Sequence, residues 1–308
     1  MNVLDDILST LNLKGALYFR TDFNSPWAVK VPDLEQAARF HLCVQGGCDV
    51  AIENGDTVEL SQGDLILIPR GRSHILADKP VSQAPPLESV LADAGYEGEG
   101  VLSVGRGNPD ASTQLICGHF TFRRGADHPI LRALPDYLVT SSAMRAREVW
   151  LDEILRLLTR HMFDNESELT STATKLSEIF FIELIRLGIG QTPQMQSILS
   201  AFTDRQIGRA LELMHKDAEQ PWTVASMASE VGMSRSSFAD RFRELIGIGP
   251  MSYLSEWRLQ KALALLEDER CSVQQAAAGT GYLSAAAFTR AFTARFGHSP
   301  REFRRNAG

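Results

Sequence analysis

The stretch Ser236–Tyr253, SSFADRFRELIGIGPMSY, returns as Ala286–Phe303, AAFTRAFTARFGHSPREF, at an offset of 50 positions. Each copy carries two phenylalanines four residues apart, followed by a glycine and then a proline. Aromatic side chains at that spacing lie on one face of a helix, and Gly and Pro favour the end of a helix. The repeat therefore predicts two helices, each with an aromatic core face and a defined end.

A shorter helix is expected before each copy. Thr223–Ser234, TVASMASEVGMS, and Ser272–Ser284, SVQQAAAGTGYLS, both combine small residues, a Gly turn and a final serine that can cap the next helix. A small-residue helix, a turn and a capped second helix form a helix-turn-helix. The alternative is an α-helical repeat used only for packing, which the doubled cap and the exposed arginines disfavour.

With these two units, residues 203–305 resemble the DNA-binding domain of the AraC/XylS family of bacterial transcription regulators. The resemblance extends to Gly281-Tyr282, the tail FGHSPREFRR and the connecting stretch YLSEWRLQKALALLED. It implies a sequence-specific regulator, expected to be an activator, that binds double-stranded DNA and RNA polymerase. Ala276 and Thr280 stand where the family usually carries larger aliphatic residues, so the second unit is expected to pack more loosely.

The connecting stretch has a length that suits DNA. A helix from Met251 to Glu267 is about 25 Å long at ~1.5 Å per residue. That length can hold two reading helices roughly one DNA turn apart, so that one chain contacts two successive major grooves.

Side chains of the second helix of each unit that point away from the aromatic face are candidates for DNA contact. Arg290 is the strongest candidate for a guanine contact, because a guanidinium can bond O6 and N7 together. Ala285 and Ala286 offer only methyl groups, so the second reading helix is expected to read DNA shape and thymine methyls as well.

In the first unit, the role of Asp240 stays open. Asp240 either accepts a hydrogen bond from cytosine N4 or forms an ion pair with Arg243. Arg241 is expected to meet phosphate or solvent rather than a base. The full candidate set for DNA binding is Ser234, Arg235, Ser236, Ser237, Ala239, Asp240, Arg241, Ser284, Ala285, Ala286, Thr289 and Arg290.

The front of the chain has a β pattern. Over residues 16–123, short β-rich or apolar runs alternate with Gly-Gly, Asn-Gly-Asp, Gln-Gly-Asp and Arg-Gly-Arg turn signals, which predicts a sandwich or barrel. Within it, GDLILIPRGRSH, Gly63–His74, fits the second sequence motif of the cupin superfamily. Of the first cupin motif only Phe40–Cys43 is left. Residues 18–125 therefore resemble a cupin barrel.

The cupin resemblance implies a sensor barrel, and His41, Cys43, His74 and Cys117 are the candidate sensing residues. A small organic effector in the barrel is the leading interpretation. Oxidation of the thiols and a mixed His/Cys zinc site are alternatives, and the identity of any metal is unknown. A metal-dependent cupin enzyme and a constitutive DNA-binding protein without an effector are the remaining alternatives to a regulator with no enzymatic activity.

The predicted fold class is α+β multidomain: an N-terminal cupin-like β-barrel (jelly roll) with a helical hairpin, then a C-terminal all-α tandem helix-turn-helix domain. Apolar residues at helical spacing predict the hairpin and suggest that it forms a homodimer. Two glycines and Pro193 predict a linker after it. The expected divisions are the barrel at 1–141, the hairpin at 142–190, the linker at 191–202 and the DNA-binding domain at 203–308.

Composition limits the remaining possibilities. The chain has 308 residues, of which 44% are hydrophobic, enough to bury cores in two domains. Residues 203–308 carry 14 Lys and Arg against 12 Asp and Glu, and the rest of the chain carries 17 against 26. The net charge of −7 therefore belongs to the front and does not exclude DNA, because phosphate affinity depends on where basic residues lie.

The four cysteines, including Cys48 and Cys271, follow no CxxC spacing, which disfavours a structural zinc knuckle and a secreted disulfide scaffold. The longest apolar runs are too short to cross a membrane, and the start of the chain lacks the pattern of a signal peptide. We therefore expect a cytoplasmic protein that does not associate with membranes.

Overall fold

The computed structural model describes residues 3–10, 13–34, 37–53, 55–98, 100–105, 112–123, 125–126, 128–145, 148–164, 171–188, 193–268 and 270–305. The chain forms two compact units. The β unit comprises Leu13–Phe122 and Leu134–Gly188. The helical unit comprises Met1–Asn12, Arg123–Ala133 and Ile189–Gly308.

The division differs from the expected one, because two pieces of the front of the chain belong to the helical unit. Helix α1 (Val3–Thr10) packs against helices α8 and α11, and Arg123–Ala133, the docked segment, contacts α11. These long-range contacts have no local signal in the sequence. Residues 1–141, which were expected to form the barrel, therefore include two segments that fold with the helical unit.

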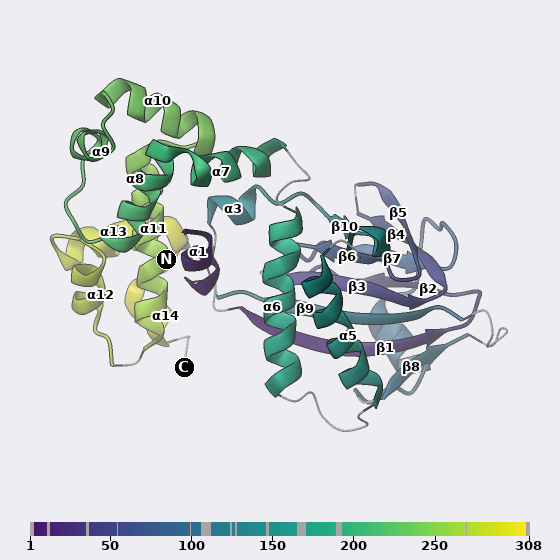
Figure 1. Cartoon of the computed structure of the whole chain (residues 1–308). Helices are drawn as coiled ribbons and strands as arrows, with labels where there is room; N and C mark the ends of the chain where they lie inside the picture. The colour runs from purple at the N-terminus through teal and green to yellow at the C-terminus, as the bar shows by residue number, and fades with distance from the viewer. Residues whose placement is uncertain are drawn as a thin grey trace. The chain divides into compact units, whose positions relative to one another are not determined.

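Two β-sheets form the β unit (Figure 1). One sheet has six strands in the order β10-β6-β3-β9-β1-β8, and the other has four in the order β2-β7-β4-β5. This arrangement confirms the predicted cupin-like architecture. The strands are β1 Lys14–Phe23, β2 Ala28–Val31, β3 Ala37–Gln45, β4 Gly47–Ile52, β5 Thr57–Ser61, β6 Leu65–Ile68, β7 His74–Ala77, β8 Val101–Val104, β9 Gln114–Thr121 and β10 Leu138–Thr140.

Register at the centre of the larger sheet decides which side chains enter the barrel. Strands β3 and β9 are antiparallel, with His41 opposite Cys117 and Cys43 opposite Leu115. Alternate residues of a strand point to opposite faces, so these four side chains share one face. Cys43, Leu115 and Cys117 belong to the apolar core of the barrel. The candidate sensing residues His41, Cys43 and Cys117 therefore lie in the interior of the barrel.

The opposite face of the same sheet carries aromatic residues that pack against the helical hairpin. Phe40 lies 6.4 Å from Phe180, and Phe120 lies 4.7 Å from Phe181, measured between ring centroids. Such pairs contribute about 0.5–1.5 kcal/mol each beyond the area that they bury. The helices of the β unit are α2 Leu87–Asp93, α4 Ser142–Arg145, α5 Val149–Asp164 and α6 Ser171–Gly188.

Short helices build the helical unit, and their order contains two helix-turn-helix units (Figure 1). Helix α11 connects the first unit, α9 and α10, to the second, α12 and α13. None of the helices in the described part of the chain combines the length and hydropathy of a membrane span. Besides α1, the helices are α3 Pro129–Arg132, α7 Pro193–Thr203, α8 Arg205–Lys216, α9 Val224–Glu230, α10 Arg235–Ile246, α11 Pro250–Glu267, α12 Val273–Gly279, α13 Ala285–Phe296 and α14 Pro300–Arg305.

Helix α7 occupies most of the segment where a linker was expected. The linker prediction rested on glycines and on Pro193, but Pro193 is the first residue of α7, a position that proline favours. Ile198 and Ala201 are buried, and the Ser197 hydroxyl donates to the carbonyl oxygen of Leu245 at 3.0 Å. The segment therefore packs on α10 as part of the helical unit.

Candidate nucleic-acid interface and sensor cavity

The first reading helix, α10, has the predicted start, core and end. The Ser234 hydroxyl accepts a hydrogen bond from the Ser237 amide at 3.2 Å and caps the helix. Phe238 and Phe242 are both 0% exposed. Gly247 ends the helix with φ at 87°, a left-handed conformation that glycine adopts without steric cost. The sequence motif thus fixes the helix at both ends.

The second reading helix, α13, repeats these features. The Ser284 hydroxyl accepts from the Ala287 amide at 3.2 Å. Phe288 and Phe292 are both 0% exposed, and Gly297 ends the helix with φ at 76°. The substituted positions of the preceding helix are buried as well: Ala276 and Thr280 are 0% exposed. The last turn differs, because Phe296 of α13 is half-buried whereas its counterpart Ile246 of α10 is buried.

The predicted contact residues lie on the outer faces of the two reading helices. Ala239 and Thr289 are half-buried beside the aromatic faces. Among the residues that the structure describes, no hydrogen bond or ion pair engages the Arg290 guanidinium, which is exposed. The other exposed candidates are Ser234, Arg235, Ser236, Ser237, Asp240, Arg241, Ser284, Ala285 and Ala286.

Leu283 belongs to this surface, and the sequence analysis missed it. Its side chain is fully exposed, at 101%. It stands in the turn directly before the Ser284 cap, and that position next to the reading helix is the signal that could have found it. Met233, at the same place in the first unit, is half-buried. An exposed leucine beside a reading helix can contact a thymine methyl group.

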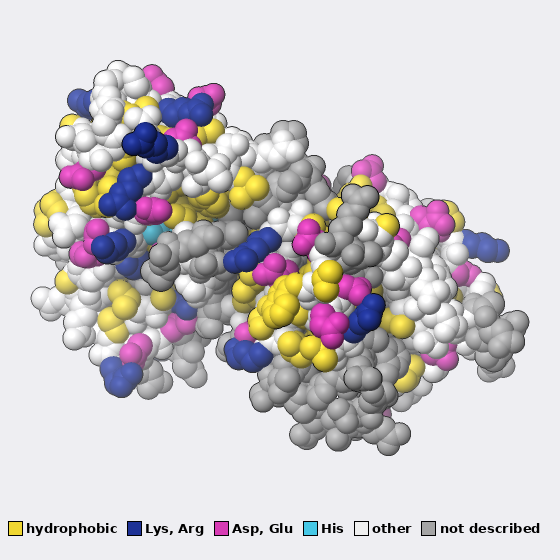
Figure 2. All heavy atoms as spheres, viewed as in Figure 1, with side chains coloured by type: hydrophobic (Ala, Val, Ile, Leu, Met, Phe, Trp, Pro, Cys, Tyr) yellow, Lys and Arg dark blue, Asp and Glu magenta, His cyan; other side chains and the backbone are white. Residues whose placement is uncertain are grey.

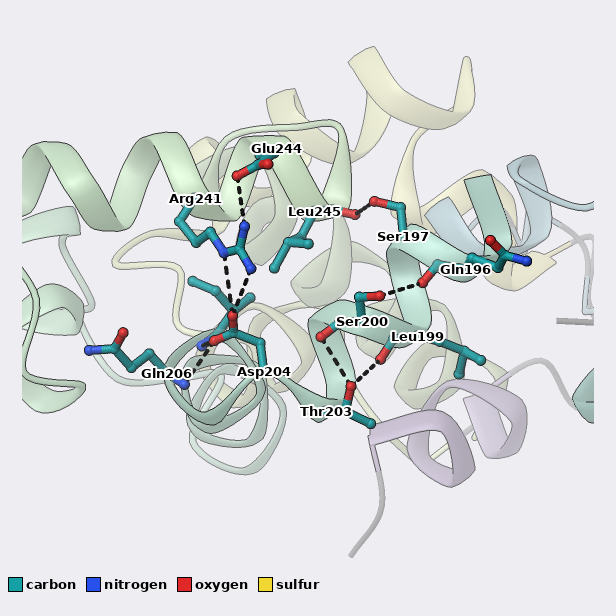
Figure 3. A network of polar contacts seen from close by, with 11 residues as sticks. Gln196, Ser197, Leu199, Ser200, Thr203, Asp204, Gln206, Arg241, Glu244 and Leu245 are labelled. Atoms are coloured by element: carbon teal, nitrogen blue, oxygen red, sulfur yellow. Dashed lines mark hydrogen bonds and ion pairs between the residues drawn. The ribbon is translucent and has the colours of Figure 1, made fainter. Parts of the chain in front are cut away.

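Arg241 is held within the helical unit by two carboxylates, as Figure 3 shows. Its guanidinium lies 2.9 Å from Glu244 and 3.3 Å from Asp204. Asp204 also caps α8, where it accepts from the amides of Gln206 and Ile207, each at 2.9 Å. A phosphate would have to compete with both carboxylates for Arg241.

Asp204 has a pKa below its ordinary value. Its partial burial raises the pKa, but hydrogen bonds from the two α8 amides and the charge of Arg241 outweigh that effect. The ionised carboxylate therefore joins the start of α8 to α10.

Asp240 forms the ion pair that the sequence left open. Its carboxylate lies 3.7 Å from the Arg243 guanidinium, and the two side chains are 77% and 60% exposed. A pair so open to solvent contributes at most about 1 kcal/mol. The ion pair is weak enough for Asp240 to exchange Arg243 for a base.

The docked segment runs along one face of α11, the helix between the two helix-turn-helix units. Arg123 pairs with Glu267 at 3.3 Å, and Arg132 pairs with Glu256. Between them, the Gln260 amide donates to a backbone carbonyl of the docked segment at 3.2 Å. The three α11 partners follow helical spacing, so the segment covers one side of α11.

A buried polar cluster completes this contact. The Tyr253 hydroxyl lies 2.7 Å from His215 Nε2 and 3.3 Å from His128 Nε2. One hydroxyl has one proton, so Tyr253 donates to one imidazole and accepts from the other. Asp6 of α1 lies 3.6 Å from His215 Nδ1, and Trp257 stacks on His215 with centroids 3.9 Å apart. Burial lowers the pKa of both histidines, which keeps the imidazoles neutral.

In the β unit, three of the four sensor candidates form one chain of hydrogen bonds. His74 Nδ1 lies 2.8 Å from the carbonyl oxygen of Arg72 and must donate to it. The other nitrogen of neutral His74 therefore accepts from His41 Nε2, at 2.8 Å. His41 Nδ1 is then an acceptor for the Cys117 thiol, at 3.0 Å. Geometry thus assigns both tautomers and keeps the thiol protonated.

Electrostatics agree with this assignment. Burial and the charges of His74 and Arg39 hold the pKa of His41 well below its usual range, and burial lowers the pKa of His74 to about 4. Burial raises the pKa of Cys117 to about 12. At neutral pH the whole chain of hydrogen bonds carries no charge.

The hydrogen-bond geometry does not fit the zinc alternative. Cys117 and His74 contact opposite ring nitrogens of His41, so the three side chains cannot share one ion in this arrangement. The described residues contain no group of three His, Cys, Asp or Glu side chains that could hold a metal.

Cys43 lies apart from the chain of hydrogen bonds that joins Cys117, His41 and His74. Its thiol donates to the carbonyl oxygens of Gln45 and Gly46, both at 3.5 Å, and burial raises its pKa to about 11. Thiolate is the form that oxidants attack, so protonated thiols disfavour redox sensing. The structure thus separates Cys43 from the other three candidates.

Arg39 is a second residue that the sequence analysis missed. It lies two residues before His41 on β3, which puts both side chains on the interior face. Arg39 is 6% exposed and lines a cavity in the β unit together with His41 and Cys117. A charged residue on the inward face of a barrel strand was the available signal.

Comparisons with known proteins match both units. The cupin family matches residues 2–189, and a helix-turn-helix domain family matches residues 227–306. The chain is 28% identical over 312 residues to the HTH-type transcriptional regulator AlkR of Acinetobacter baylyi, covering 100% of both chains. It is 26% identical over 267 residues to the RCS-specific HTH-type transcriptional activator RclR of Escherichia coli, covering 86% of this chain and 84% of RclR.

Among solved structures, the chain is similar to the DNA-binding domain of the global transcriptional factor AdpA in complex with a target DNA. The identity is 31%, and the match covers 33% of this chain and 92% of that one, with a TM-score of 0.32.

Proposed function

Because the chain belongs to the AraC/XylS family of transcriptional regulators and carries an N-terminal cupin domain, we propose that it is a sequence-specific transcriptional activator controlled by a small molecule bound in its barrel. The observation that carries the DNA part is the pair of capped reading helices on either side of α11 in the chain. Helix α11 has 18 residues, or about 27 Å at ~1.5 Å per residue. The protein acts on double-stranded DNA in the cytoplasm.

The contact residues divide by chemistry. Arg290 reads a guanine, and Ala285, Ala286 and Leu283 supply apolar contacts to thymine methyl groups. The serines at the helix starts and Arg235 contact phosphates or base edges. Arg241 reaches a phosphate only by leaving its carboxylate partners.

Selection of binding sites from a random duplex library tests this proposal. The selected site should bind the full chain about 10³-fold or more tighter than random DNA at one stated salt concentration. Arg290→Ala should weaken binding to that site, whereas Arg209→Ala, a matched change on α8 where Arg209 pairs with Glu212 at 3.0 Å, should not. Equal affinity for all sequences would contradict the proposal.

Control by the barrel follows the chain. Strand β9 carries Cys117 and continues into the docked segment, whose residues contact α11. An effector that shifts β9 would therefore shift the docked segment and, through its contacts, the position of α11. A 10-fold change in DNA affinity requires that the effector's binding free energies for the DNA-competent and DNA-incompetent forms of the protein differ by about 1.4 kcal/mol.

A thermal-shift screen of the full chain against metabolites, divalent metals and mild oxidants tests control. The effector proposal expects a metabolite to stabilise the wild-type chain and to act less on Cys117→Ser and His74→Ala variants. Stabilisation by an oxidant or a metal alone would favour the redox or zinc alternative. No response to any class would favour a constitutive regulator.

As an activator, the protein also has RNA polymerase as a partner. Transcription in vitro from a promoter that carries the selected site tests this. The protein should raise the amount of transcript, and a fall in transcript would identify a repressor.

The helical hairpin supports a homodimer. Trp150 and Leu157 lie seven residues apart on α5 and are 64% and 43% exposed, and Ile179 of α6 is 41% exposed. Figure 2 shows hydrophobic side chains gathered over these two helices. Exposed apolar patches of this kind mark association sites. A second copy of the chain is therefore the partner that this face would bind.

Light scattering of the full chain tests the dimer. The wild type should have twice the mass of one chain, and Trp150→Glu should reduce it to one. Val101→Glu, which changes an exposed apolar residue on β8, should stay dimeric. A monomeric wild type at tens of micromolar would contradict the dimer.

A further inference from the structure

Residues 217–222, the α8–α9 segment, lead from α8 into the first helix of the first helix-turn-helix unit. The segment is closed by its own hydrogen bonds: the Trp222 indole donates to the carbonyl oxygen of Asp217 at 2.9 Å, and the Gln220 amide donates to the same oxygen at 3.1 Å. Ala218 is 0% exposed. Because the cap of α9 follows directly, a displacement of this segment would move the start of α9 with it.

Arg258 of α11 holds the α8–α9 segment. Its guanidinium donates to the carbonyl oxygen of Ala218 at 2.7 Å and to that of Gln220 at 2.6 Å. Two bonds from one planar guanidinium fix a direction as well as a distance. Burial lowers the pKa of Arg258, and the nearby Tyr282 and Glu219 oppose that effect. Arg258 therefore ties the segment to α11 beside residues of the second helix-turn-helix unit.

The turn of the second helix-turn-helix unit packs against the same segment. Gly281, between α12 and α13, has a φ of 77°, and a Cβ atom at this position would stand 2.6 Å from the carbonyl oxygen of Glu219. Only glycine, which has no Cβ, allows the two backbones to come so close. The next residue, Tyr282, packs on Phe288 of α13 with ring centroids 5.4 Å apart. The α8–α9 segment therefore leads into α9 and also contacts the turn before α13.

We propose that Arg258 and Gly281 position the two reading helices relative to one another and thereby set the number of base pairs between the two sequences that one chain reads. Joined by α11 alone, the two helix-turn-helix units could turn about that helix. The α8–α9 segment adds a second connection, which restricts this turn. Arg258 is thus a positioning residue. The inference rests on the proposed function, because it concerns the DNA site proposed there.

Binding sites with altered spacing test the inference. In the selected site, one base pair is inserted or removed between the two recognised sequences, which displaces one of them by about 3.4 Å along the DNA and about 35° around it. The wild-type chain should bind both altered sites at least about 10-fold more weakly than the selected site. Equal affinity for the three sites would show that the reading helices are not held at a fixed spacing, and would overturn the inference.

Arg258→Ala removes both hydrogen bonds to the α8–α9 segment. Its preference for the selected site over the altered sites should fall to about one third of the wild-type value or less, because the units can then adjust to either spacing. Arg209→Ala, which removes an exposed arginine that pairs with Glu212 at 3.0 Å, should keep the wild-type preference. Because the preference is a ratio for one protein sample, a smaller folded fraction does not change it. A wild-type preference in Arg258→Ala would overturn the inference.

Gly281→Ala is an independent test, with Gly232→Ala as its matched control. Gly232 lies in the turn of the first helix-turn-helix unit with a φ of 68°, and a Cβ atom there would meet no other atom within 4 Å. Both substitutions impose the strain of a left-handed conformation, but only the methyl group at position 281 pushes against Glu219. Gly281→Ala should therefore change the preference among the three sites, whereas Gly232→Ala should not. Equal preferences in the two variants would contradict the role given to Gly281.

The inference and the proposed function fail in different ways. If the wild-type chain prefers its selected site, but Arg258→Ala and Gly281→Ala keep its spacing preference, the inference is wrong and the proposed function stands. If the chain binds no DNA sequence preferentially, both are wrong.

Discussion

The two helix-turn-helix units have the same caps and aromatic cores but present different surfaces. The outer face of α10 carries several charges, and Arg241 and Arg243 are engaged by carboxylates. The outer face of α13 carries alanines and Arg290, next to the exposed Leu283. The two helix-turn-helix units thus share the residues that build them and differ in the side chains on their outer faces.

Matching positions in the two cores also differ. Tyr253 is 1% exposed and shares its hydroxyl with His128 and His215. Its counterpart at the same offset, Phe303, is 2% exposed and stacks on His298 with ring centroids 5.8 Å apart. Tyr253, the polar residue of this pair, lies where the docked segment contacts α11. The first unit therefore has a link to the front of the chain at the position where the second unit has an apolar contact.

The largest expected effect tests whether the two cores are equivalent. Phe238→Ala and Phe288→Ala each remove a side chain that is 0% exposed, and each should cost about 3–5 kcal/mol. Urea unfolding of the full chain, followed by tryptophan fluorescence with Trp27 and Trp150 replaced by Phe throughout so that Trp222 and Trp257 report, measures the loss in the helical unit. A loss below about 1 kcal/mol for Phe288→Ala alone would show that the second unit packs loosely, as the sequence suggested.

The next largest effect is expected when the contacts of the Tyr253 hydroxyl with His128 and His215 are removed. Tyr253→Phe gives the first unit the aromatic ring type of the second and leaves two buried imidazoles without their shared hydroxyl. It should lower the free energy of unfolding by about 1–3 kcal/mol. Tyr282→Phe is the control, and we expect a change within about 0.5 kcal/mol. Equal effects of the two substitutions would contradict the role given to Tyr253.

Acid should also destabilise the first helix-turn-helix unit more than the second. Burial depresses the pKa of His128 and His215, and the charges of Arg132 and Lys261 add to this while Asp6 opposes it. Below about pH 6.5 the unfolded chain therefore binds protons that the folded chain does not, so stability is lost as the pH falls. Amide hydrogen exchange, corrected for intrinsic rates, should quicken more in α10 and α11 than in α13 between about pH 7 and 5. Equal changes of the exchange rates in α10, α11 and α13 would contradict this prediction.

A smaller effect concerns the contact proposed between Leu283 and a thymine methyl group. Leu283→Ser should weaken binding to the selected site by about 1 kcal/mol, close to the value of a buried methyl group. Replacing the contacted thymine by uracil should cost the wild type as much and should add nothing in the variant. Met233→Ser, at the half-buried counterpart, should have less effect on binding. Additive losses would show that Leu283 does not contact the methyl group.

The smallest effect concerns Arg241. The double change Asp204→Asn and Glu244→Gln keeps the cap of α8, because Asn and Asp cap equally well, and removes both partly exposed ion pairs of Arg241. Stability should fall by less than about 1 kcal/mol. The freed Arg241 can then meet a phosphate, so the salt dependence of DNA binding should steepen by about one unit of slope. An unchanged slope would show that Arg241 stays away from DNA.

Local sequence signals were enough to predict the reading helices. Ser234, Ser284, Gly247 and Gly297 act within one helix turn of their own positions, so the repeat predicts both ends of each helix. The cupin resemblance likewise follows from a contiguous motif that contains His74. These features could be predicted because their physical causes lie within a few residues.

Long-range features could not be predicted in the same way. Contact between His128 and Tyr253 joins residues 125 positions apart, and nothing near either residue signals it. Arg39 has a charged side chain in an apolar strand, but its position at a cavity depends on six other segments of the barrel. Pro193 misled the prediction, because proline both ends helices and begins them.

The most direct test of the central claim maps which base pairs the two reading helices recognise. The full chain, Arg235→Ala and Arg290→Ala are each titrated against all single-base variants of the selected site. The account predicts that Arg290→Ala costs about 1–3 kcal/mol and relaxes preference at one base pair. Arg235→Ala should act at a position about 10 base pairs away, one helical turn along the DNA. If Arg290→Ala weakens binding to all sequences equally, or if both variants act at the same position, the claim that one chain reads two successive major grooves is contradicted.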